Sequence, residues 1–331
     1  MKRNLYIFHV IILLCACNSR NMRTIGAIEQ ADSSLDSILH KDAPIEIIAE
    51  GFDWSEGPLW IPAHNMLLFS DIPKNKVCKW TAEKGLETYL TPSGYTGTTP
   101  RGGEVGSNAL ILDLQGRLVL CQHGDRRMAR MDAPLDKPSP KFISLADNYG
   151  GKKFNSPNDA IMRSNGDLFF TDPPYGMEKQ NEDPARELPF HGVFKVAADG
   201  KVTLLTDSLT RPNGLALTPD EKTLIVANSD PNKAIWYMFD LAENDSLVNP
   251  RILRDVTAEA GKESGLPDGF KIDRKGNIFA TGPGGVWIFN SSGKLLGKIK
   301  VPVATSNCAL AEDDTVLYIT ASKYVLRVKM R

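Results

Sequence analysis

A short pattern recurs six times along this chain, and each copy is a polar residue followed by an apolar, strand-forming run. Successive copies are 52, 50, 55, 55 and 39 residues apart. A repeat of this size indicates an array of supersecondary units that bury their apolar faces against one another. The six copies begin at Glu56, Asn108, Asn158, Asn213, Asp268 and Asn307.

Each copy contains the signature of a β-hairpin. A turn residue comes eight positions after the start, and it is glycine in three copies: Gly116, Gly166 and Gly276. A second β-rich run follows every turn, as expected for two paired strands. The remaining length accommodates two more strands, for example 192–196 and 201–205. The sequence therefore predicts an all-β, six-bladed β-propeller with four-stranded blades over residues 45–331. A β-sandwich is the alternative, but it does not predict a common register in six copies.

The six starting residues are candidates for a ligand ring. Inner strands of a propeller run along its axis, so equivalent positions should converge on one face. Asn and Asp also favour turns before strands, which explains one or two copies but not their convergence. Carboxylate and carboxamide oxygens suit a hard cation, and Ca²⁺ accepts irregular ligand sets better than Mg²⁺. Zn²⁺ and Mn²⁺ are further alternatives.

Five short motifs lie at or near these positions: 56–60 (EGPLW), 156–159 (SPND), 170–176 (FTDPPYG), 211–216 (RPNGLA) and 266–269 (LPDG). They resemble the gluconolactonase/regucalcin/luciferin-regenerating-enzyme family, and residues 122–127 (QHGDRR) resemble its bacterial gluconolactonase branch. The resemblance runs from about residue 45 to the C-terminus. It implies a six-bladed propeller with one catalytic divalent cation, commonly Ca²⁺, and lactone hydrolysis as the usual activity.

The resemblance also implies roles for individual residues. Glu56, Asn213 and Asp268 match direct metal ligands, and Asn158 matches an asparagine that contacts the metal, water or substrate. Asp268 is the first candidate for the general base, because the motif and the ring position agree. Asp159 is the second candidate, with bracing of the ring by hydrogen bonds as its alternative role. Animal regucalcins have a substrate-binding arginine where this chain has Ser156, so their sugar contacts do not transfer.

Substrate contacts are expected from Asn108, Asn158, Arg101, His123 and Tyr175. Arg101 and Tyr175 lie in two long loops, 92–107 and 173–191, that are rich in Gly, Pro and charge. Loops of this length in a compact repeat are often functional. Packing between blades is the alternative role for His123 and Tyr175.

We therefore expect a divalent-metal-dependent hydrolase that opens a sugar-acid lactone. The alternatives are another ester or phosphoester hydrolase on the same scaffold, or a non-catalytic sugar-binding propeller. Serine-esterase, zincin and P-loop signatures are absent from the sequence. The formal net charge of −1 gives no electrostatic reason to expect a nucleic-acid partner.

The N-terminus predicts export. Lys2 and Arg3 precede a largely apolar run over 5–16, which is too short to span a bilayer but suits a signal peptide. Residues 14–17 (LCAC) resemble a bacterial lipobox, which predicts a signal peptide over 1–16 and lipidation of Cys17. Asn18 in place of Asp favours the outer membrane, on its periplasmic or surface face. An ordinary cleaved signal with a chance cysteine is the alternative. Residues 17–44 are expected to be a polar tether with at most one short helix.

Overall fold

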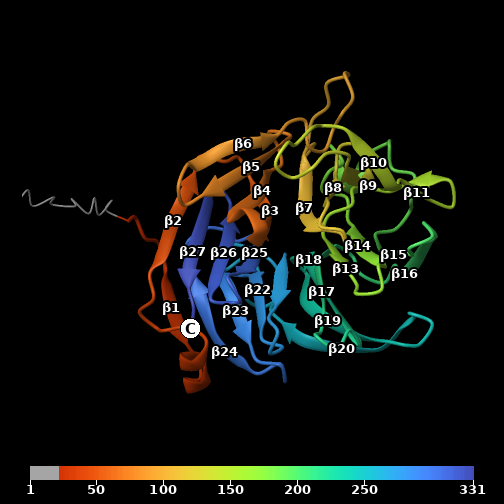
Figure 1. Ribbon diagram of the computed structural model, residues 1–331. Helices are drawn as coiled ribbons and strands as arrows, with labels where there is room; N and C mark the ends of the chain where they lie inside the picture. The colour runs from red at the N-terminus through yellow and green to blue at the C-terminus, as the bar shows by residue number, and fades with distance from the viewer. Residues whose placement is uncertain (1–21) are drawn as a thin grey trace, which may run out of the picture.

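The computed structural model describes residues 22–331, and it confirms the six-bladed all-β propeller (Figure 1). Six antiparallel sheets surround a central axis, and helical structure is limited to three short 3₁₀ segments, η1 (Ser33–Ser37), η2 (Pro62–His64) and η3 (Gln180–Glu182). Within the described range no helix is long and apolar enough to cross a membrane. The predicted signal peptide and the lipidation site Cys17 lie outside the described residues.

The first four blades each consist of four consecutive strands, ordered from the axis outward. Blade 1 has β3 (Ser55–Ile61), β4 (Met66–Asp71), β5 (Lys76–Thr81) and β6 (Gly85–Leu90), and blade 2 has β7 (Ser107–Leu112), β8 (Leu118–Gln122), β9 (Arg127–Met131) and β10 (Phe142–Ala146). Blade 3 has β13 (Ala160–Met162), β14 (Leu168–Asp172), β15 (Gly192–Val196) and β16 (Val202–Thr206), and blade 4 has β17 (Pro212–Leu217), β18 (Thr223–Asp230), β19 (Lys233–Leu241) and β20 (Leu247–Asp255). A small hairpin, β11 (Asn148–Tyr149) with β12 (Lys152–Lys153), lies between blades 2 and 3 in the sequence.

The last two blades are completed by strands from the N-terminus. Blade 6 consists of β25 (Asn307–Ala311), β26 (Val316–Ala321), β27 (Tyr324–Lys329) and, outermost, β2 (Ile45–Glu50). Pairing of β2 with β27 closes the ring, because it joins the two ends of the domain in one sheet. Blade 5 consists of β21 (Phe270–Ile272), β22 (Ile278–Gly282), β23 (Gly285–Phe289) and β24 (Leu295–Lys300), with β1 (Ala27–Gln30) as a fifth strand on its outer edge.

The segment expected to be a tether is therefore folded onto the propeller from its first described residues. β1 pairs with β24 from Ala27↔Lys300 to Gln30↔Gly297, and η1 follows directly. Leu35 and Leu39 are fully buried against blades 5 and 6. Sequence reasoning treated this stretch as polar linker because its few apolar residues are widely spaced, although two leucines are enough to hold a short segment on an apolar groove.

The core is divided among the six junctions between blades. Each of the six apolar clusters combines side chains from two neighbouring blades, as in the cluster of Phe154, Phe170 and Phe194 with Val119 between blades 2 and 3. Hydroxyl groups near the axis also link one blade to the next. They donate to backbone carbonyls in the pairs Ser70–Asn108, Thr171–Asn213, Thr281–Ser306 and Ser306–Ser55. These links hold the inner strands in a common register.

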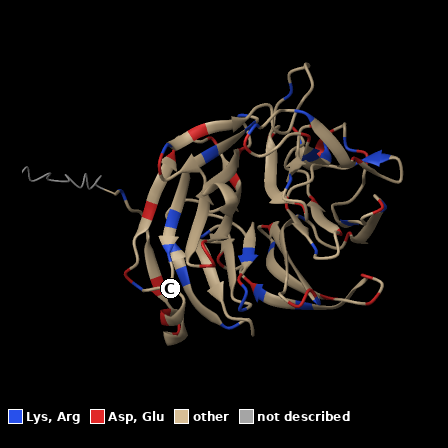
Figure 2. Cartoon of the chain, viewed as in Figure 1, with Lys and Arg blue, Asp and Glu red and all other residues tan. Residues whose placement is uncertain are grey.

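Acidic and basic residues are interspersed over the strands and loops in the view of Figure 2. This mixing agrees with the near-neutral net charge. The described cysteines, Cys78, Cys121 and Cys308, are free and buried.

Candidate active site

Five of the six ring residues line one cavity of about 550 Å³ at the end of the axis where the inner strands begin. Glu56, Asn108 and Asn213 stand at the second positions of β3, β7 and β17, while Asn158 and Asp268 come two residues before β13 and β21. Asn307 starts β25 but does not reach the cavity. Its side-chain oxygen accepts from the backbone N–H of Cys308 and from Lys271 Nζ, at 2.9 and 3.1 Å.

Close contact between blades makes this convergence possible. A Cβ atom on Gly57 would lie 2.2 Å from the Asn108 carbonyl oxygen, and one on Gly214 would lie 2.3 Å from the Asp268 carbonyl oxygen. No side chain fits at such distances, so glycine after the ring residue allows the next blade to approach. Gly57 also has a φ of 52°, which favours glycine.

A second recurring contact holds the backbone just before the ring residues. In three blades a side-chain oxygen at or near the end of the second strand accepts hydrogen bonds from the backbone. The donors are N–H groups of residues two or three positions before the ring residue. The carboxylates and amide that do this are Asp71 (from Asp53 and Trp54), Asp172 (from Asn155 and Ser156) and Asn228 (from Arg211). Asp71, Asp172 and Asn228 therefore act as positioning residues for Glu56, Asn158 and Asn213.

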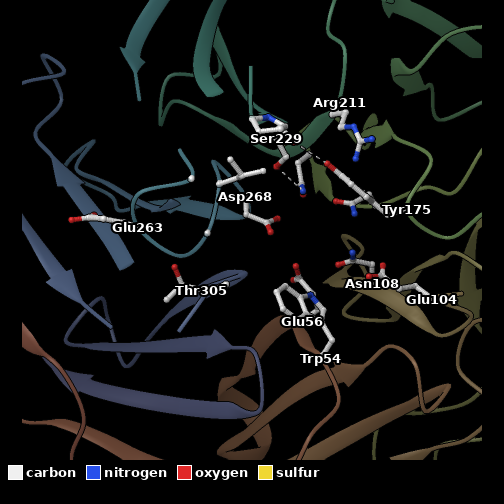
Figure 3. A pocket seen from close by; sticks show the side chains of 17 residues that line it. Trp54, Glu56, Glu104, Asn108, Tyr175, Arg211, Ser229, Glu263, Asp268 and Thr305 are labelled. Carbon is white, nitrogen blue, oxygen red and sulfur yellow. Dashed lines mark hydrogen bonds between the residues drawn. The ribbon is translucent and has the colours of Figure 1, made fainter. Parts of the chain in front are cut away.

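Glu56 and Asp268 are directed toward each other across the cavity (Figure 3). Burial, together with the nearby carboxylates Asp159 and Glu104, raises the pKa of Glu56 to about 8. Burial and the charge of Glu56 raise the pKa of Asp268 well above its usual value. Asp268 Oδ1 is buried without a hydrogen-bond partner. Two buried carboxylates without a basic partner are unfavourable unless a proton or a cation neutralises them.

The donor set of the cavity fits a hard divalent cation. The cavity wall includes Glu56, Asp268, Asn158 and Asn213, and no His or Cys is among the described residues that line it. Carboxylate and carboxamide oxygens are the ligands that Ca²⁺ and Mg²⁺ prefer. Among the described residues, no cluster of three or more His, Cys, Asp or Glu side chains is arranged to hold a metal ion. A cation in this cavity therefore also needs carboxamide oxygens of the ring as ligands.

Ser229 sets the orientation of one ring amide. Asn213 Nδ2 donates to Ser229 Oγ at 3.0 Å, which leaves the Asn213 oxygen free to face the cavity. Ser229 Oγ in turn donates to the carbonyl of Pro267, the residue before Asp268. One hydroxyl thus couples the positions of two candidate ligands, and sequence reasoning missed it because Ser229 precedes no recognisable motif.

Asp159, the second candidate for the base, is buried but is not part of the cavity wall. Its Oδ1 accepts from the backbone N–H of Ala160, and Oδ2 is buried without a partner. Burial raises its pKa, and the ammonium of Lys271 opposes that rise. Asp159 therefore lies outside the cavity wall, and its part in the site, as a base or as a brace of the ring through hydrogen bonds, stays a prediction.

The predicted substrate residues are divided between the cavity and the structure around it. Tyr175 and Asn108 line the cavity. Arg101 instead donates to the carbonyls of Gly124 and Gly176 at 2.6 and 2.8 Å. His123 is fully buried and does not line the cavity. Arg101 and His123 therefore support the cavity from behind.

Several cavity residues besides Ser229 were missed, among them Trp54, Glu104 and Arg211. Trp54 precedes Glu56 by two positions, Glu104 lies in the 92–107 loop, and Arg211 opens the motif around Asn213. The Arg211 guanidinium lies over the Tyr175 ring, with 5.7 Å between the carbon of the guanidinium and the ring centroid. The sequence contains one indication for Glu104, which is the only acidic residue in the loop 92–107.

Comparison with known proteins identifies the family. The SMP-30/gluconolactonase/LRE-like region matches residues 54–323, which include all the residues that line the cavity and the inner strands of all six blades, but not β1, β2 or β27. The chain belongs to this family. It is 40% identical over 322 residues to a gluconolactonase of Zymomonas mobilis, covering 96% of this chain and 89% of that protein.

Two further relatives support the assignment. The solved structure of a gluconolactonase from Xanthomonas campestris is 30% identical, with a TM-score of 0.79 over 95% of this chain and 100% of that one. A pentonolactonase of Haloferax volcanii is 27% identical over 273 residues, covering 81% of each chain. The family resemblance that the sequence motifs indicated is thereby confirmed.

Proposed function

We propose that this chain is a divalent-cation-dependent hydrolase that opens a sugar-acid lactone. The observation that carries the proposal is the pair Glu56 and Asp268, two buried carboxylates that face each other beside ring amides in a cavity of about 550 Å³. Cavities of roughly 300–1,000 Å³ suit small molecules. The relatives named gluconolactonase and pentonolactonase favour a lactone as that molecule.

A divalent cation, with Ca²⁺ as the first choice, would be held by Glu56, Asn158, Asn213 and Asp268, and it would polarise the lactone carbonyl and stabilise the oxyanion. The residues of the chain supply the rest. Asp268 Oδ1, which lacks a hydrogen-bond partner, is placed to accept the proton of the attacking water. Asn108 and Tyr175 present polar groups on the same wall for the hydroxyls of the substrate.

A direct test is a lactone panel read with a pH indicator, since ring opening releases a proton at neutral pH. We expect calcium-loaded protein to open at least one aldonolactone much faster than the uncatalysed reaction. A chelator should abolish the activity, and added calcium should restore it. If chelator-treated and calcium-loaded protein act equally fast, the cation has no part in the reaction.

Arg211 favours a second candidate, hydrolysis of a phosphoester. Its guanidinium lines the cavity and forms no ion pair with a carboxylate in the described part of the chain. Arginine is well suited to bind phosphate. Faster turnover of a phosphoester than of any lactone in the panel would establish this alternative. A binding protein without catalysis would instead show no turnover, and Asp268→Ala would alter only its affinity for ligand.

We also propose export and anchoring through a lipid on Cys17, on the basis of the N-terminal sequence. The full-length protein expressed in a Gram-negative host should partition into the detergent phase and fractionate with the outer membrane. The Cys17→Ser variant should lose the acyl modification seen by mass spectrometry. An unmodified Cys17 in the membrane fraction, or a mature chain that begins elsewhere, would contradict the assignment.

A further inference from the structure

Glu104 is an acidic cavity residue that the roles assigned above leave unused. It lies in the loop between β6 and β7, and its side chain lines the same cavity as Glu56 and Asp268. Figure 3 places it beside Asn108, on the opposite side of the central carboxylates from Glu263. A third of its side-chain surface is exposed. The carboxyl group is therefore available to a bound ligand.

The loop that carries Glu104 is anchored to three blades. Arg101 donates to Gly124 of blade 2 and Gly176 of blade 3, and the N–H of Gly106 donates to the Ile72 carbonyl of blade 1 at 2.9 Å. Gly102 packs so closely against Glu178 that a Cβ atom there would lie 2.9 Å from its carboxyl oxygen. Bonds to rigid elements on both sides of Glu104 fix its position, as a group that takes part in catalysis requires.

The surroundings of Glu104 favour the protonated form of its carboxyl group in the metal-free fold. Nδ1 of His123 lies 3.5 Å from Glu104 Oε2. Burial lowers the pKa of His123 to about 3, so this imidazole is neutral and offers no positive charge. Arg101 is committed to the carbonyls of Gly124 and Gly176. Burial raises the pKa of Glu104 to about 7, so a substantial share of these carboxyl groups carries a proton near neutral pH.

Lactone opening needs a proton donor as well as a base. When water attacks the carbonyl carbon, a C–O bond forms and a proton passes to the base. The bond from that carbon to the ring oxygen then breaks, and the oxygen leaves with the electron pair. An aliphatic alkoxide is a poor leaving group, so protonation of the ring oxygen accelerates this step. Asp268 is the proposed base that takes the proton of the attacking water, so the residue that donates a proton to the ring oxygen is still to be identified.

We propose that Glu104 is this general acid. This inference rests on the proposed function. The proton of the Glu104 carboxyl passes to the leaving ring oxygen, which becomes the hydroxyl of the product. The proton taken up by Asp268 returns to solvent, and Glu104 regains one from solvent, so the balance is lactone plus water to hydroxy acid. The neutral imidazole of His123 lies beside this carboxyl group, outside the cavity wall, and adds no positive charge to it.

The test compares two leaving groups in the calcium-loaded enzyme. Gluconolactone releases an aliphatic hydroxyl, whereas dihydrocoumarin releases a phenol, whose pKa of roughly 10 makes protonation less necessary. We expect Glu104→Gln to lower kcat about 100-fold on gluconolactone and less than about fivefold on dihydrocoumarin. Asp268→Asn, the matched control, should lower both rates to a similar extent. Equal losses on the two substrates in Glu104→Gln, or no loss, would overturn the proposal.

Further measurements separate this role from a structural one. At pH 6, where the Glu104 carboxyl group is mostly protonated, calcium affinity by isothermal titration calorimetry and the melting temperature should change little in Glu104→Gln. In Glu104→Ala, added acetate should restore part of the activity on gluconolactone, because it can enter the vacated space and donate a proton. Failure of acetate to rescue a folded, calcium-binding variant would contradict the acid role. If wild-type enzyme opens no lactone at all, the proposed function fails instead.

Discussion

The Asp268→Asn enzyme is expected to lose at least about 1,000-fold in kcat/KM on the lactone that the wild type opens fastest. The substitution keeps the shape of the side chain and one oxygen, but it removes the charge to which we assign cation binding and acceptance of the water proton. General base catalysis alone contributes about 10²–10⁴-fold. Steady-state kinetics at saturating calcium, with calcium affinity from calorimetry, would measure the two losses separately.

Two further variants help to interpret the result for Asp268→Asn. Asp268→Glu retains the carboxylate and should keep part of the calcium affinity while misplacing the base. Asp159→Asn should keep most of the activity, because Asp159 lies outside the cavity wall. An Asp268→Asn enzyme within tenfold of wild-type kcat, combined with an inactive Asp159→Asn enzyme, would transfer the role of base to Asp159.

Calcium is expected to stabilise the protein more at pH 8 than at pH 5. Burial, followed by the repulsion of Asp159 and Glu104, raises the pKa of Glu56 from 4.5 to about 8 in the metal-free fold. Between these values the folded state binds a proton that the unfolded state has lost. The free energy of unfolding of the metal-free protein therefore falls as pH rises from about 4.5 to 8. Asp268, whose pKa is also raised, acts in the same direction.

Bound calcium replaces those protons and removes the penalty at high pH. At 100 times the dissociation constant a ligand stabilises the folded state by about 2.7 kcal/mol. For a domain of this size that corresponds to a rise in Tm of roughly 5 °C. Differential scanning fluorimetry with chelator or calcium at pH 5, 6, 7 and 8 would show the difference growing with pH. A difference that shrinks with pH would contradict the assignment of these carboxylates.

Glu56→Gln is the matched control for this experiment. The amide keeps an oxygen for the N–H of Gly57, which donates to Glu56 at 2.7 Å, but carries no charge. At pH 8 and without metal, the variant should melt at a higher temperature than the wild type. Its melting temperature should hardly respond to calcium. A purely structural role for Glu56 does not explain a variant that is more stable without metal and yet no longer stabilised by calcium.

Many of the cavity residues could be predicted from the sequence, because they occupy equivalent positions in the repeated units. Because each blade places the same strand on the axis, the alignment of the copies on Glu56, Asn158, Asn213 and Asp268 predicts that these residues lie together. The alignment failed at Asn307, whose side chain turns to Lys271 and the backbone instead of the cavity. Register determines which residues approach the axis, but local hydrogen bonds decide where each side chain points.

Residues outside the repeat were harder to interpret. Arg101 was expected to meet substrate, since a charged residue in a long loop usually faces solvent or ligand. Its guanidinium instead joins two neighbouring loops through carbonyl groups 23 and 75 residues away in the chain. Leu35 and Leu39 were assigned to a tether because the stretch around them is polar and rich in Ser and Asp. Their burial depends on a groove made by blades 5 and 6.

The sequence alone determined the number of blades, the strand that lines the axis and the oxygen-rich ring, because these properties repeat and a repeat can be aligned with itself. Only the tertiary structure decided that β2 closes the ring, that Ser229 orients Asn213 and that Glu104 enters the cavity. Each of these depends on contacts between segments far apart in the chain. Such contacts leave no period in the sequence, since the packing of the whole propeller sets their geometry.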